Sequence, residues 1–492
     1  MPSSAKRKRK QIDSSADAAD GSSLQALTPA WAAAPSKVAL EPGQVVYFQG
    51  RAELQCKSGA AYIQGTYLES AKPGINVCAD LEAGGLLPIQ ALPSDTKVPR
   101  APGSCCLAFN PATDSDCEDK GNAGPDWTVY GEDGSHAALH IMPEWAEAAS
   151  GISTAMHEAC AGLRGHATAA VCGSKGTGKS TFGRLLLNAL LNVCEEVAWL
   201  DTDCGQPEFT VPGLVSLTYV RQPVYGMPHM HPLRPARAHF LGHLSPEWDS
   251  QRYGTAVADL ARFHAKRSSA VPLVVNTCGW IKGLGEDVLA DVLRCTRPSH
   301  VVMLQTPTPR RNVPQGQFWL TEDSAAGPLA PPAAAQQEAT VIQLPAVQSQ
   351  GPAGSTPAGP KKMTATQSRN LAWLNFVRTC CGLPLHRSKW VAEPVAEAAE
   401  ALTRYPPFAV GLDSVKLEFL HTAVPEHLAG AVLNGALVGL CCEDTQRSTT
   451  PAGAPHHRRL CLPPTARIPA LSFRCGRSMM VGPKQLVCSR LL

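Results

Sequence analysis

The chain has 492 residues, a formal net charge of +3 and 44% hydrophobic residues. This length predicts two to four globular domains. The small net charge excludes a surface that is positively charged throughout, so any nucleic-acid contact must come from a local basic patch. No segment has the length and apolarity of a membrane span, so we expect no membrane partner. The polar, charged beginning of the chain does not resemble a secretory signal peptide.

The 18 cysteines include no C-x-x-C pair and no Cys/His spacing of the zinc-finger type. Several of them are adjacent in sequence, as in Cys105-Cys106 and Cys380-Cys381. We therefore expect reduced, mostly buried thiols in an intracellular protein.

A basic run, Lys6-Arg7-Lys8-Arg9-Lys10, lies in a Ser/Ala/Asp-rich segment. We expect residues 1–35 to be a disordered basic tail. The run is typical of a nuclear import signal or a nucleic-acid tether, which favours the nucleus. The alternative interpretation is a solvated charged terminus.

The remaining chain divides into four parts. Residues 36–141 contain short strand-like runs between glycine turns and predict an N-terminal β domain. Within residues 142–305, apolar strands alternate with helical patterns. This predicts an α/β fold of the P-loop NTPase type, with a mainly parallel central sheet covered on both faces. Residues 306–365 are rich in Pro, Ala, Gln and Gly and predict a low-complexity insertion. Residues 366–492 predict a lid helix followed by a C-terminal β-rich domain.

A glycine-rich loop follows the apolar run at 167–172 and fits the pattern G-x-x-x-x-G-K-[ST]. Its glycines allow the backbone to approach a phosphate closely, and the N–H groups that open the next helix face the anion. Lys179 would reach the β- and γ-phosphates of ATP, and the Ser180 hydroxyl would bind Mg²⁺. The alternative is a glycine-rich turn with a surface lysine. The candidate ATP-binding residues are Gly173, Ser174, Lys175, Gly176, Thr177, Gly178, Lys179, Ser180 and Thr181.

An acidic turn follows the next apolar strand, with Asp201 and Asp203 two residues apart. Residues at this spacing in a strand point the same way, so one carboxylate could hold Mg²⁺ while the other accepts a proton from an attacking hydroxyl. We expect Asp203 to serve as catalytic base or metal ligand and Asp201 as a second catalytic acid. Gln206 could orient a phosphate or hydroxyl, or only close the turn.

A third segment, Asn276-Thr277-Cys278-Gly279-Trp280, ends another predicted core strand. Ligands of open α/β sheets bind outside the carboxyl ends of the strands, so this segment should face the same crevice. Trp280 could stack on a base or clamp an acceptor strand, or it could be a core tryptophan.

Together, the glycine-rich loop, the segment 201–213 and the segment 276–280 resemble the polynucleotide 5′-hydroxyl kinases, especially the nucleolar branch that acts in pre-ribosomal RNA processing. The resemblance covers roughly residues 170–305. It implies transfer of the γ-phosphate of ATP to a 5′-hydroxyl end of RNA or DNA, an endonuclease partner and a nucleolar location. It also implies that Asp203 is base or metal partner, and that Thr277, Gly279 and Trp280 form a T-x-G-W clasp that holds lysine and nucleic acid. Asp201 stands where the nucleolar branch usually has Glu.

The family also has an arginine-bearing lid, written R-x-x-x-R, which this chain does not show clearly. Arg310, Arg311 and Arg369 are candidates, and Arg369 opens a helical segment. A further group of basic and aromatic residues lies between core elements and could contact RNA phosphates or be solvated loop residues. They are Arg221, Tyr225, His229, His231, Arg234 and Arg237.

Four functions could be built around a glycine-rich loop of this kind. The leading hypothesis is an ATP- and Mg²⁺-dependent polynucleotide 5′-hydroxyl kinase acting on pre-rRNA. The second is an ATP-binding scaffold subunit of an RNA-processing complex. A GTPase would need an N/T-K-x-D motif, which is absent. The clasp and the extra domains disfavour a metabolite kinase.

Overall fold

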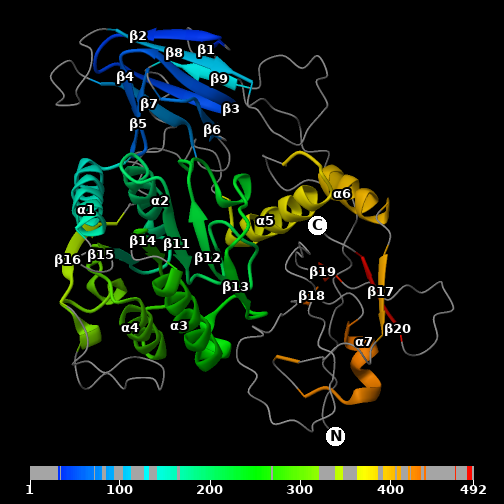
Figure 1. Cartoon of the computed structure of the whole chain (residues 1–492). Helices are drawn as coiled ribbons and strands as arrows, with labels where there is room; N and C mark the ends of the chain where they lie inside the picture. Colours follow the sequence, from blue (N-terminus) through cyan, green and yellow to red (C-terminus); the bar gives the residue numbers. More distant parts are fainter. Residues whose placement is uncertain are drawn as a thin grey trace, which may run out of the picture.

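The computed structural model (Figure 1) places a β domain above an α/β domain, with two further helices beside the latter. The structure describes residues 32–33, 35–70, 72–79, 85–92, 104–111, 127–131, 141–162, 167–267, 270–320, 338–346, 363–385, 392–404, 407–411, 419–420, 423–433, 437–438, 471–472 and 485–489. The predicted basic tail at 1–35 lies almost entirely outside these ranges.

The N-terminal domain is a nine-stranded antiparallel sheet organised around one long strand, β3 (Val45–Ser58). Along β3 the side chains alternate between buried and partly exposed, which is the pattern of a strand with one face on a core. This strand pairs with four others along its length. The remaining strands are β1 (Ala32–Ala33), β2 (Lys37–Leu40), β4 (Ala60–Ile63), β5 (Thr66–Glu69), β6 (Ile75–Ala79), β7 (Leu87–Ala91), β8 (Cys105–Asn110) and β9 (Trp127–Tyr130).

The tip of the β4–β5 hairpin contacts the α/β domain. Its two turn residues, Gln64 and Gly65, both have positive φ, as a tight two-residue hairpin turn requires. A Cβ at Gly65 would lie 2.5 Å from the Leu185 carbonyl oxygen of helix α2 (Lys179–Leu190), so only glycine allows the hairpin to approach this closely.

The α/β domain contains a seven-stranded sheet in the order β13-β12-β11-β14-β10-β15-β16. The five strands from β11 to β16 in this order are parallel, and β12 and β13 are antiparallel at one edge. The prediction of a mainly parallel sheet is therefore confirmed. The strands are β10 (Thr168–Cys172), β11 (Val197–Asp201), β12 (Leu214–Val220), β13 (Arg237–Phe240), β14 (Leu273–Asn276), β15 (His300–Gln305) and β16 (Thr340–Pro345).

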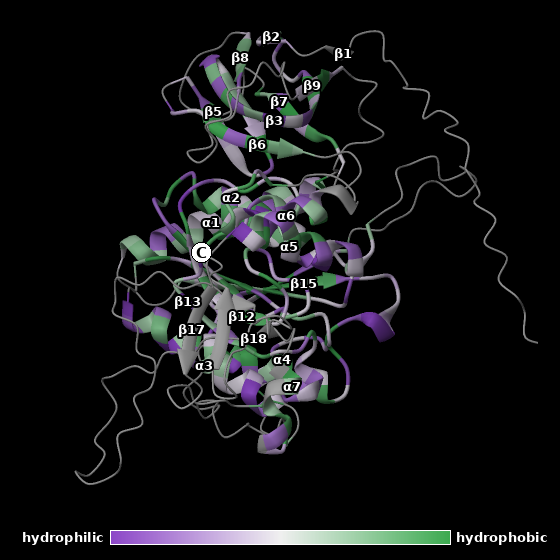
Figure 2. Ribbon diagram, turned by 90° about the vertical axis from the view of Figure 1, so that its right-hand side faces the viewer, coloured by the Kyte–Doolittle hydropathy of each residue, from purple (hydrophilic) through white to green (hydrophobic). Residues whose placement is uncertain are grey.

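Helices cover both faces of this sheet, as the uniformly apolar strands require. Alternate residues of each strand join opposite cores: Ala170 and Leu200 pack with one helix pair, Ala169 and Trp199 with the other. The first pair is α3 (Ser250–Arg267) and α4 (Leu284–Thr296), and the second is α1 (Pro143–Ala161) and α2. Figure 2 shows the hydrophobic character of strands such as β15 and the mixed character of the helices.

One strand lies where the sequence predicted none. The residues of β16 fall inside the predicted low-complexity insertion at 306–365, yet they extend the parallel sheet beside β15 in register from His300↔Thr340 to Gln305↔Pro345. The Trp145 indole N–H of α1 also donates to the Pro345 carbonyl oxygen at 2.9 Å. A six-residue strand in a Pro- and Ala-rich surrounding carries too little periodicity to be recognised, and pairing with β15 stabilises it.

After the sheet, α5 (Ala365–Cys380) begins with a capping box between Thr364 and Gln367 and packs on α6 (Ala392–Arg404). Beyond α6 the structure describes only short pieces. They include two two-stranded ladders, β17 (Pro407–Gly411) with β20 (Gln485–Ser489) and β18 (Leu437–Val438) with β19 (Leu471–Ser472), and the helix α7 (Ala429–Leu433). Most of the predicted C-terminal β-rich domain lies outside the described residues.

Candidate active site

Three neighbouring strands bring the predicted motifs to one edge of the sheet. In the register of β11, β14 and β10, Asp201 lies beside Asn276, and Asn276 lies beside Val171. The acidic turn, the segment 277–280 and the glycine-rich loop therefore leave the sheet side by side at its carboxyl edge, where ligands of such folds bind.

The glycine-rich loop connects β10 to α2 and has the backbone that anion binding needs. Gly173, Gly176 and Gly178 all have positive φ, and Gly178 is the N-cap of α2 in the left-handed conformation. The N–H groups of the loop and the first turn of α2 are thus available to a phosphate. Ser180 and Thr181 are partly exposed in this first turn.

Lys179 folds back over this loop. Its ammonium donates to the Ser174 carbonyl oxygen at 3.1 Å, and the Thr177 hydroxyl donates to the same oxygen at 2.8 Å. Burial lowers the pKa of Lys179, and the nearby Asp203 carboxylate acts in the opposite direction. A buried cation with one neutral partner in the loop is suited to a polyanion that would neutralise it.

The loop also contains a buried hydroxyl that a phosphate of ATP could hydrogen-bond. The Ser174 hydroxyl is buried and has no hydrogen-bond partner among the described residues, so a phosphate oxygen would satisfy it. The described residues include no group of three or more His, Cys, Asp or Glu side chains that could hold a metal ion. Mg²⁺ in phosphate-transfer sites takes one or two protein oxygens plus water and phosphate oxygens, and Ser180 with Asp203 would supply such a set.

Asp203 organises the acidic turn and keeps one oxygen available. Its Oδ1 accepts hydrogen bonds from the backbone N–H groups of Gly205 at 3.0 Å and Gln206 at 3.1 Å. Among the described residues no hydrogen bond to its Oδ2 is recorded. The partly exposed Gln206 thus closes the turn through its backbone, and Asp203 Oδ2 is the oxygen that can meet a metal ion or a hydroxyl.

Asp201, which was predicted as a second catalytic acid, is buried beneath the acidic turn. It is only 1% exposed, and its carboxylate accepts hydrogen bonds from four donors: the backbone N–H groups of Asp203 and Glu208, the Asn276 amide and the Trp199 indole. Burial raises the pKa of Asp201 to about 7, against these donors. The strand ends at Asp201, so the two-residue alternation of a strand does not extend to Asp203. The geometry makes Asp201 the internal anchor of the turn.

The segment 277–280 packs directly on the glycine-rich loop. The Thr277 hydroxyl is fully buried and donates to the Val171 carbonyl oxygen at 2.7 Å. At Gly279 a Cβ would lie 2.9 Å from the backbone nitrogen of Lys175, so a side chain here would push the two loops apart. Burial and the nearby Asp203 carboxylate raise the pKa of the Cys278 thiol to about 11.

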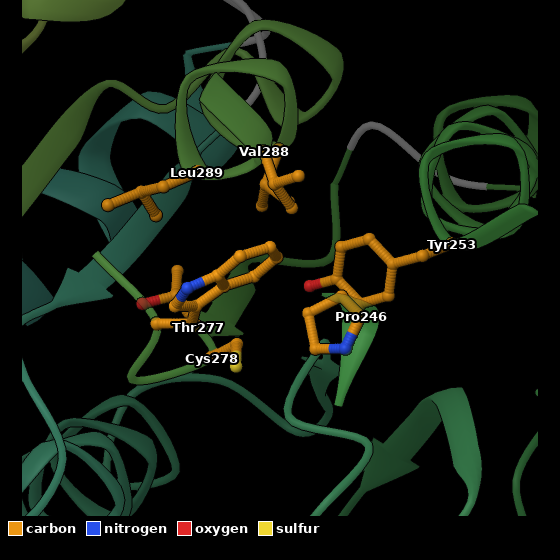
Figure 3. A pocket seen from close by; sticks show the side chains of 8 residues that line it. Pro246, Tyr253, Thr277, Cys278, Val288 and Leu289 are labelled. Carbon is orange, nitrogen blue, oxygen red and sulfur yellow. The ribbon is translucent and has the colours of Figure 1, made fainter. Parts of the chain in front are cut away.

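Trp280 is half-buried and lines a small pocket between α3 and α4. Its indole lies against Gly285, where a Cβ would come within 2.6 Å of the ring. Figure 3 shows Tyr253 and Pro246 on one side of this pocket and Val288 and Leu289 of α4 on the other, with Thr277 and Cys278 below. The tryptophan is therefore positioned by a rigid apolar pocket at the edge of the site.

Sequence reasoning missed two residues that hold the acidic turn. The Tyr253 hydroxyl of α3 donates to the Thr202 carbonyl oxygen at 2.9 Å. Glu208 is buried and accepts hydrogen bonds from Arg184 of α2 at 2.9 Å and from His231 at 2.8 Å. The acid at Glu208, five residues after Asp203, was visible in the sequence, but its partners come from distant segments.

Within the part of the chain that the structure describes, no hydrogen bond or ion pair joins the candidate lid residues to the glycine-rich loop. Arg369 donates to Thr366 of its own helix at 3.4 Å, and Arg310 and Arg311 are exposed on a short 3₁₀ turn, Pro309–Arg311.

Most of the basic and aromatic residues at 221–237 have partners within the protein. Tyr225 is buried against the N-terminal domain and donates to the Thr66 hydroxyl at 2.7 Å. The carbonyl of the buried His229 accepts from Asn375 of α5 at 2.6 Å. Arg221 pairs with Glu196, Arg237 with Asp259 and His231 with Glu208, and Arg234 is exposed.

No helix in the described ranges could span a membrane. Twelve cysteines in the described ranges are free, and four of these are buried within the β domain and the α/β domain.

The sequence is similar to a known protein family and to several individual proteins. A family model described as the P-loop of the mRNA cleavage and polyadenylation factor CLP1 matches residues 173–325. The Arabidopsis thaliana polynucleotide 5′-hydroxyl-kinase NOL9 is 33% identical over 311 residues, which cover 61% of this chain and 77% of the relative.

Two other relatives are longer. The Danio rerio polynucleotide 5′-hydroxyl-kinase NOL9 is 30% identical over 55% of this chain and 37% of its own length. The Aspergillus niger polynucleotide 5′-hydroxyl-kinase grc3 is 29% identical over 61% of this chain and 35% of its own length. The match thus spans little more than a third of these two relatives. A solved Clp1p–Pcf11p complex aligns with a TM-score of 0.43 and 13% identity over 77% of this chain and 76% of that chain, a likeness too weak to carry an argument.

Proposed function

This chain belongs to the family of polynucleotide 5′-hydroxyl kinases, and we propose that it transfers the γ-phosphate of ATP to the 5′-hydroxyl end of RNA. The observation that carries the proposal is the meeting of three motifs at one sheet edge, as set by the register of Asp201, Asn276 and Val171. A donor site alone would need only the glycine-rich loop. The acidic turn beside it supplies a group for the acceptor hydroxyl.

ATP with Mg²⁺ supplies the phosphoryl group and neutralises its negative charge when bound. The glycine-rich loop and the first turn of α2 hold the phosphates by their N–H groups, and Lys179 exchanges its bond to the Ser174 carbonyl for a phosphate oxygen. Asp203 Oδ2 accepts the hydroxyl proton or holds the metal ion, while its Oδ1 remains fixed by the turn. Ser180 would complete the protein ligands of Mg²⁺, and Gln206 is fixed beside Asp203 through its backbone N–H.

The test is phosphate transfer from labelled ATP to a 5′-hydroxyl ribo-oligonucleotide, with the same oligonucleotide carrying a 5′-phosphate as a blank. We expect wild-type protein to label only the 5′-hydroxyl strand, and Lys179→Ala and Asp203→Asn to reduce the rate by at least about 100-fold. Lys266→Ala is the control for Lys179, because Lys266 is exposed at the end of α3 and takes no part in the site.

Transfer that survives Lys179→Ala would refute the assigned site. ATP binding without any transfer, by wild-type protein alone or with its cellular partners, would favour the second candidate function, an ATP-binding scaffold subunit of an RNA-processing complex.

We further propose that the acceptor is pre-ribosomal RNA in the nucleolus, cut by an endonuclease partner that leaves a 5′-hydroxyl end during large-subunit maturation. The support is the likeness to relatives named NOL9 and the basic run Lys6–Lys10. Co-purification from nuclear extract should recover an endonuclease and spacer RNA fragments. Replacement of the five basic residues by alanine should move a tagged chain out of the nucleus, and unchanged nuclear accumulation would refute the role of that run.

A further inference from the structure

We propose that the loop at 242–250 carries a stacking platform, made by His243 and Trp248, for a base at the 5′ end of the acceptor strand. The proposal rests on the proposed function, because a polynucleotide acceptor always brings a base next to the reacting hydroxyl. It assigns a binding surface outside the three motifs described above.

The first observation is an exposed aromatic pair. Trp248 is 69% exposed, the highest value among the large hydrophobic residues in the described ranges. Its ring is stacked on His243 with centroids 4.8 Å apart and planes 8° from parallel. The histidine covers one face of the indole, so the exposed surface belongs to the opposite face. A contiguous exposed apolar patch, as opposed to a single exposed residue, is the kind of surface that marks a binding site.

The second observation is that the loop is held rigidly. The Ser245 hydroxyl accepts from the Glu247 N–H at 3.3 Å, the Ser250 hydroxyl donates to the Pro246 carbonyl at 3.1 Å, and Asp249 Oδ1 accepts from the Arg252 N–H at 2.9 Å. A ring presented by a fixed loop loses little conformational entropy when a ligand stacks on it.

The third observation is the location of the loop. It bridges the acidic turn and the Trp280 pocket, because the Leu244 carbonyl oxygen would lie 2.6 Å from a Cβ at Gly205 and Pro246 lines the pocket with Trp280. Two more exposed hydrophobic residues border the same region: Leu244, two residues after Gly242, and Leu284, which opens α4 beside Gly285. The loop therefore lies next to the acidic turn of Asp203, where the proposed function places the 5′-hydroxyl of the acceptor.

The charges beside the ring select the part of the acceptor that docks here. Glu247 and Asp249 flank Trp248, so a phosphate would be repelled at this point. A nucleobase is neutral and stacks on an aromatic face whatever its sequence. The platform therefore binds a base and leaves the backbone to other parts of the protein.

The experiment measures binding of the full chain to a 3′-labelled 5′-hydroxyl ribo-oligonucleotide by fluorescence anisotropy at fixed salt, with phosphate transfer followed in parallel. Trp248→Ala should weaken oligonucleotide binding about 5- to 10-fold, the low end of the range for base–aromatic stacking, and leave the KM for ATP unchanged. Trp248→Phe should retain most of the binding. Val193→Ala is the control, since Val193 is an exposed hydrophobic residue just beyond the C-terminus of α2.

An abasic nucleotide distinguishes stacking from other effects. Placed at the first or second position of the strand, it should weaken binding to wild-type protein by the same factor as Trp248→Ala, and it should cause no further loss in that variant. Equal binding by Trp248→Ala and wild type would overturn the platform, as would losses that simply add. A docking surface for a protein partner would give that result.

Failure of the proposed function is separable. If wild-type protein transfers no phosphate but shows the predicted binding pattern, the platform stands and the kinase activity does not. If phosphate is transferred but Trp248→Ala changes nothing, the kinase stands and the platform does not. If wild-type protein binds no oligonucleotide, both are refuted.

Discussion

Glu208 is a buried charged residue that supports the acidic turn. It is buried between Arg184 and His231, and its backbone N–H holds Asp201. Burial alone would raise the pKa of Glu208, but the Arg184 guanidinium and His231 outweigh it and hold the pKa below its ordinary value of 4.5. A lowered pKa means that folding favours the ionised form, so this stabilisation is present above pH 4.5 and disappears as the pH falls through the folded-state pKa.

We predict that Glu208→Gln lowers the free energy of unfolding by about 3 kcal/mol at pH 7, since one partner of a buried ion pair is removed. The difference from wild type should shrink as the pH is lowered below 4.5. Urea unfolding of both proteins between pH 7 and about pH 3 measures this, with Glu195→Gln, an exposed residue, as the matched control. A difference that stays constant with pH would contradict the role assigned to the charge.

At the scale of single residues, local patterns were predictable from the sequence, but contacts between distant residues were not. The glycine-rich loop and the acid at Asp203 are local patterns, and the structure places them together as the strand order requires. Asp201 is buried whereas Asp203 is partly exposed, because β11 ends at Asp201. The spacing of the two residues in the sequence cannot show where the strand ends. Tyr225 and His231 lie in a polar loop by sequence, but their partners, Thr66 and Glu208, are remote in the chain.

At the scale of elements, the site depends on the contact between the glycine-rich loop and the loop at 277–280. Gly279→Ala would place a Cβ 3.0 Å or less from the backbone of Lys175, which cannot move without displacing the phosphate-binding N–H groups. We predict a rise of about 10-fold or more in the KM for ATP, because a misplacement of this size disturbs the bound geometry. Kinetics with varied ATP measure it.

Gly151→Ala is the matched control, since Gly151 is in helix α1 and an added Cβ there meets open space. This variant should keep wild-type kinetics and be slightly more stable. An unchanged KM in Gly279→Ala would show that the two loops can separate without cost.

Strands with strong local patterns were predictable, and β16 was not. Five strands of the same sheet were predicted: β10, β11, β12, β14 and β15. Each is an apolar run bounded by turns or helices, so its own sequence identifies it. By contrast, β16 follows a Pro/Ala-rich stretch and owes its place to the exposed edge of β15 and to the Trp145 indole. Pairing of this kind is tertiary context, which a single sequence does not display.

At the scale of the whole molecule, the N-terminal β domain is fixed to the kinase domain by two asparagines of α2 and the turn after it. Asn188 is fully buried, and its amide donates to the carbonyl oxygens of Gln64 and Val224 at 3.0 Å each while accepting from the Val224 N–H at 2.8 Å. Asn192 donates to the Gly65 carbonyl at 2.7 Å and accepts from the Tyr67 N–H at 2.9 Å. The hairpin tip is thus held by side chains from α2 and from the turn that follows it.

We predict that Asn188→Ala destabilises this junction by about 3 kcal/mol, because three buried hydrogen bonds are lost and their backbone partners are left unsatisfied. The β domain should then unfold at a lower temperature than the kinase domain, so calorimetry of the full chain should show the separation between the two transitions increase. Amide exchange should accelerate in the hairpin turn around Gly65. Glu147→Ala, an exposed substitution on α1, should leave both readouts unchanged. If Asn188→Ala lowered both transitions equally, the asparagine would stabilise the kinase core and not the docking of the two domains.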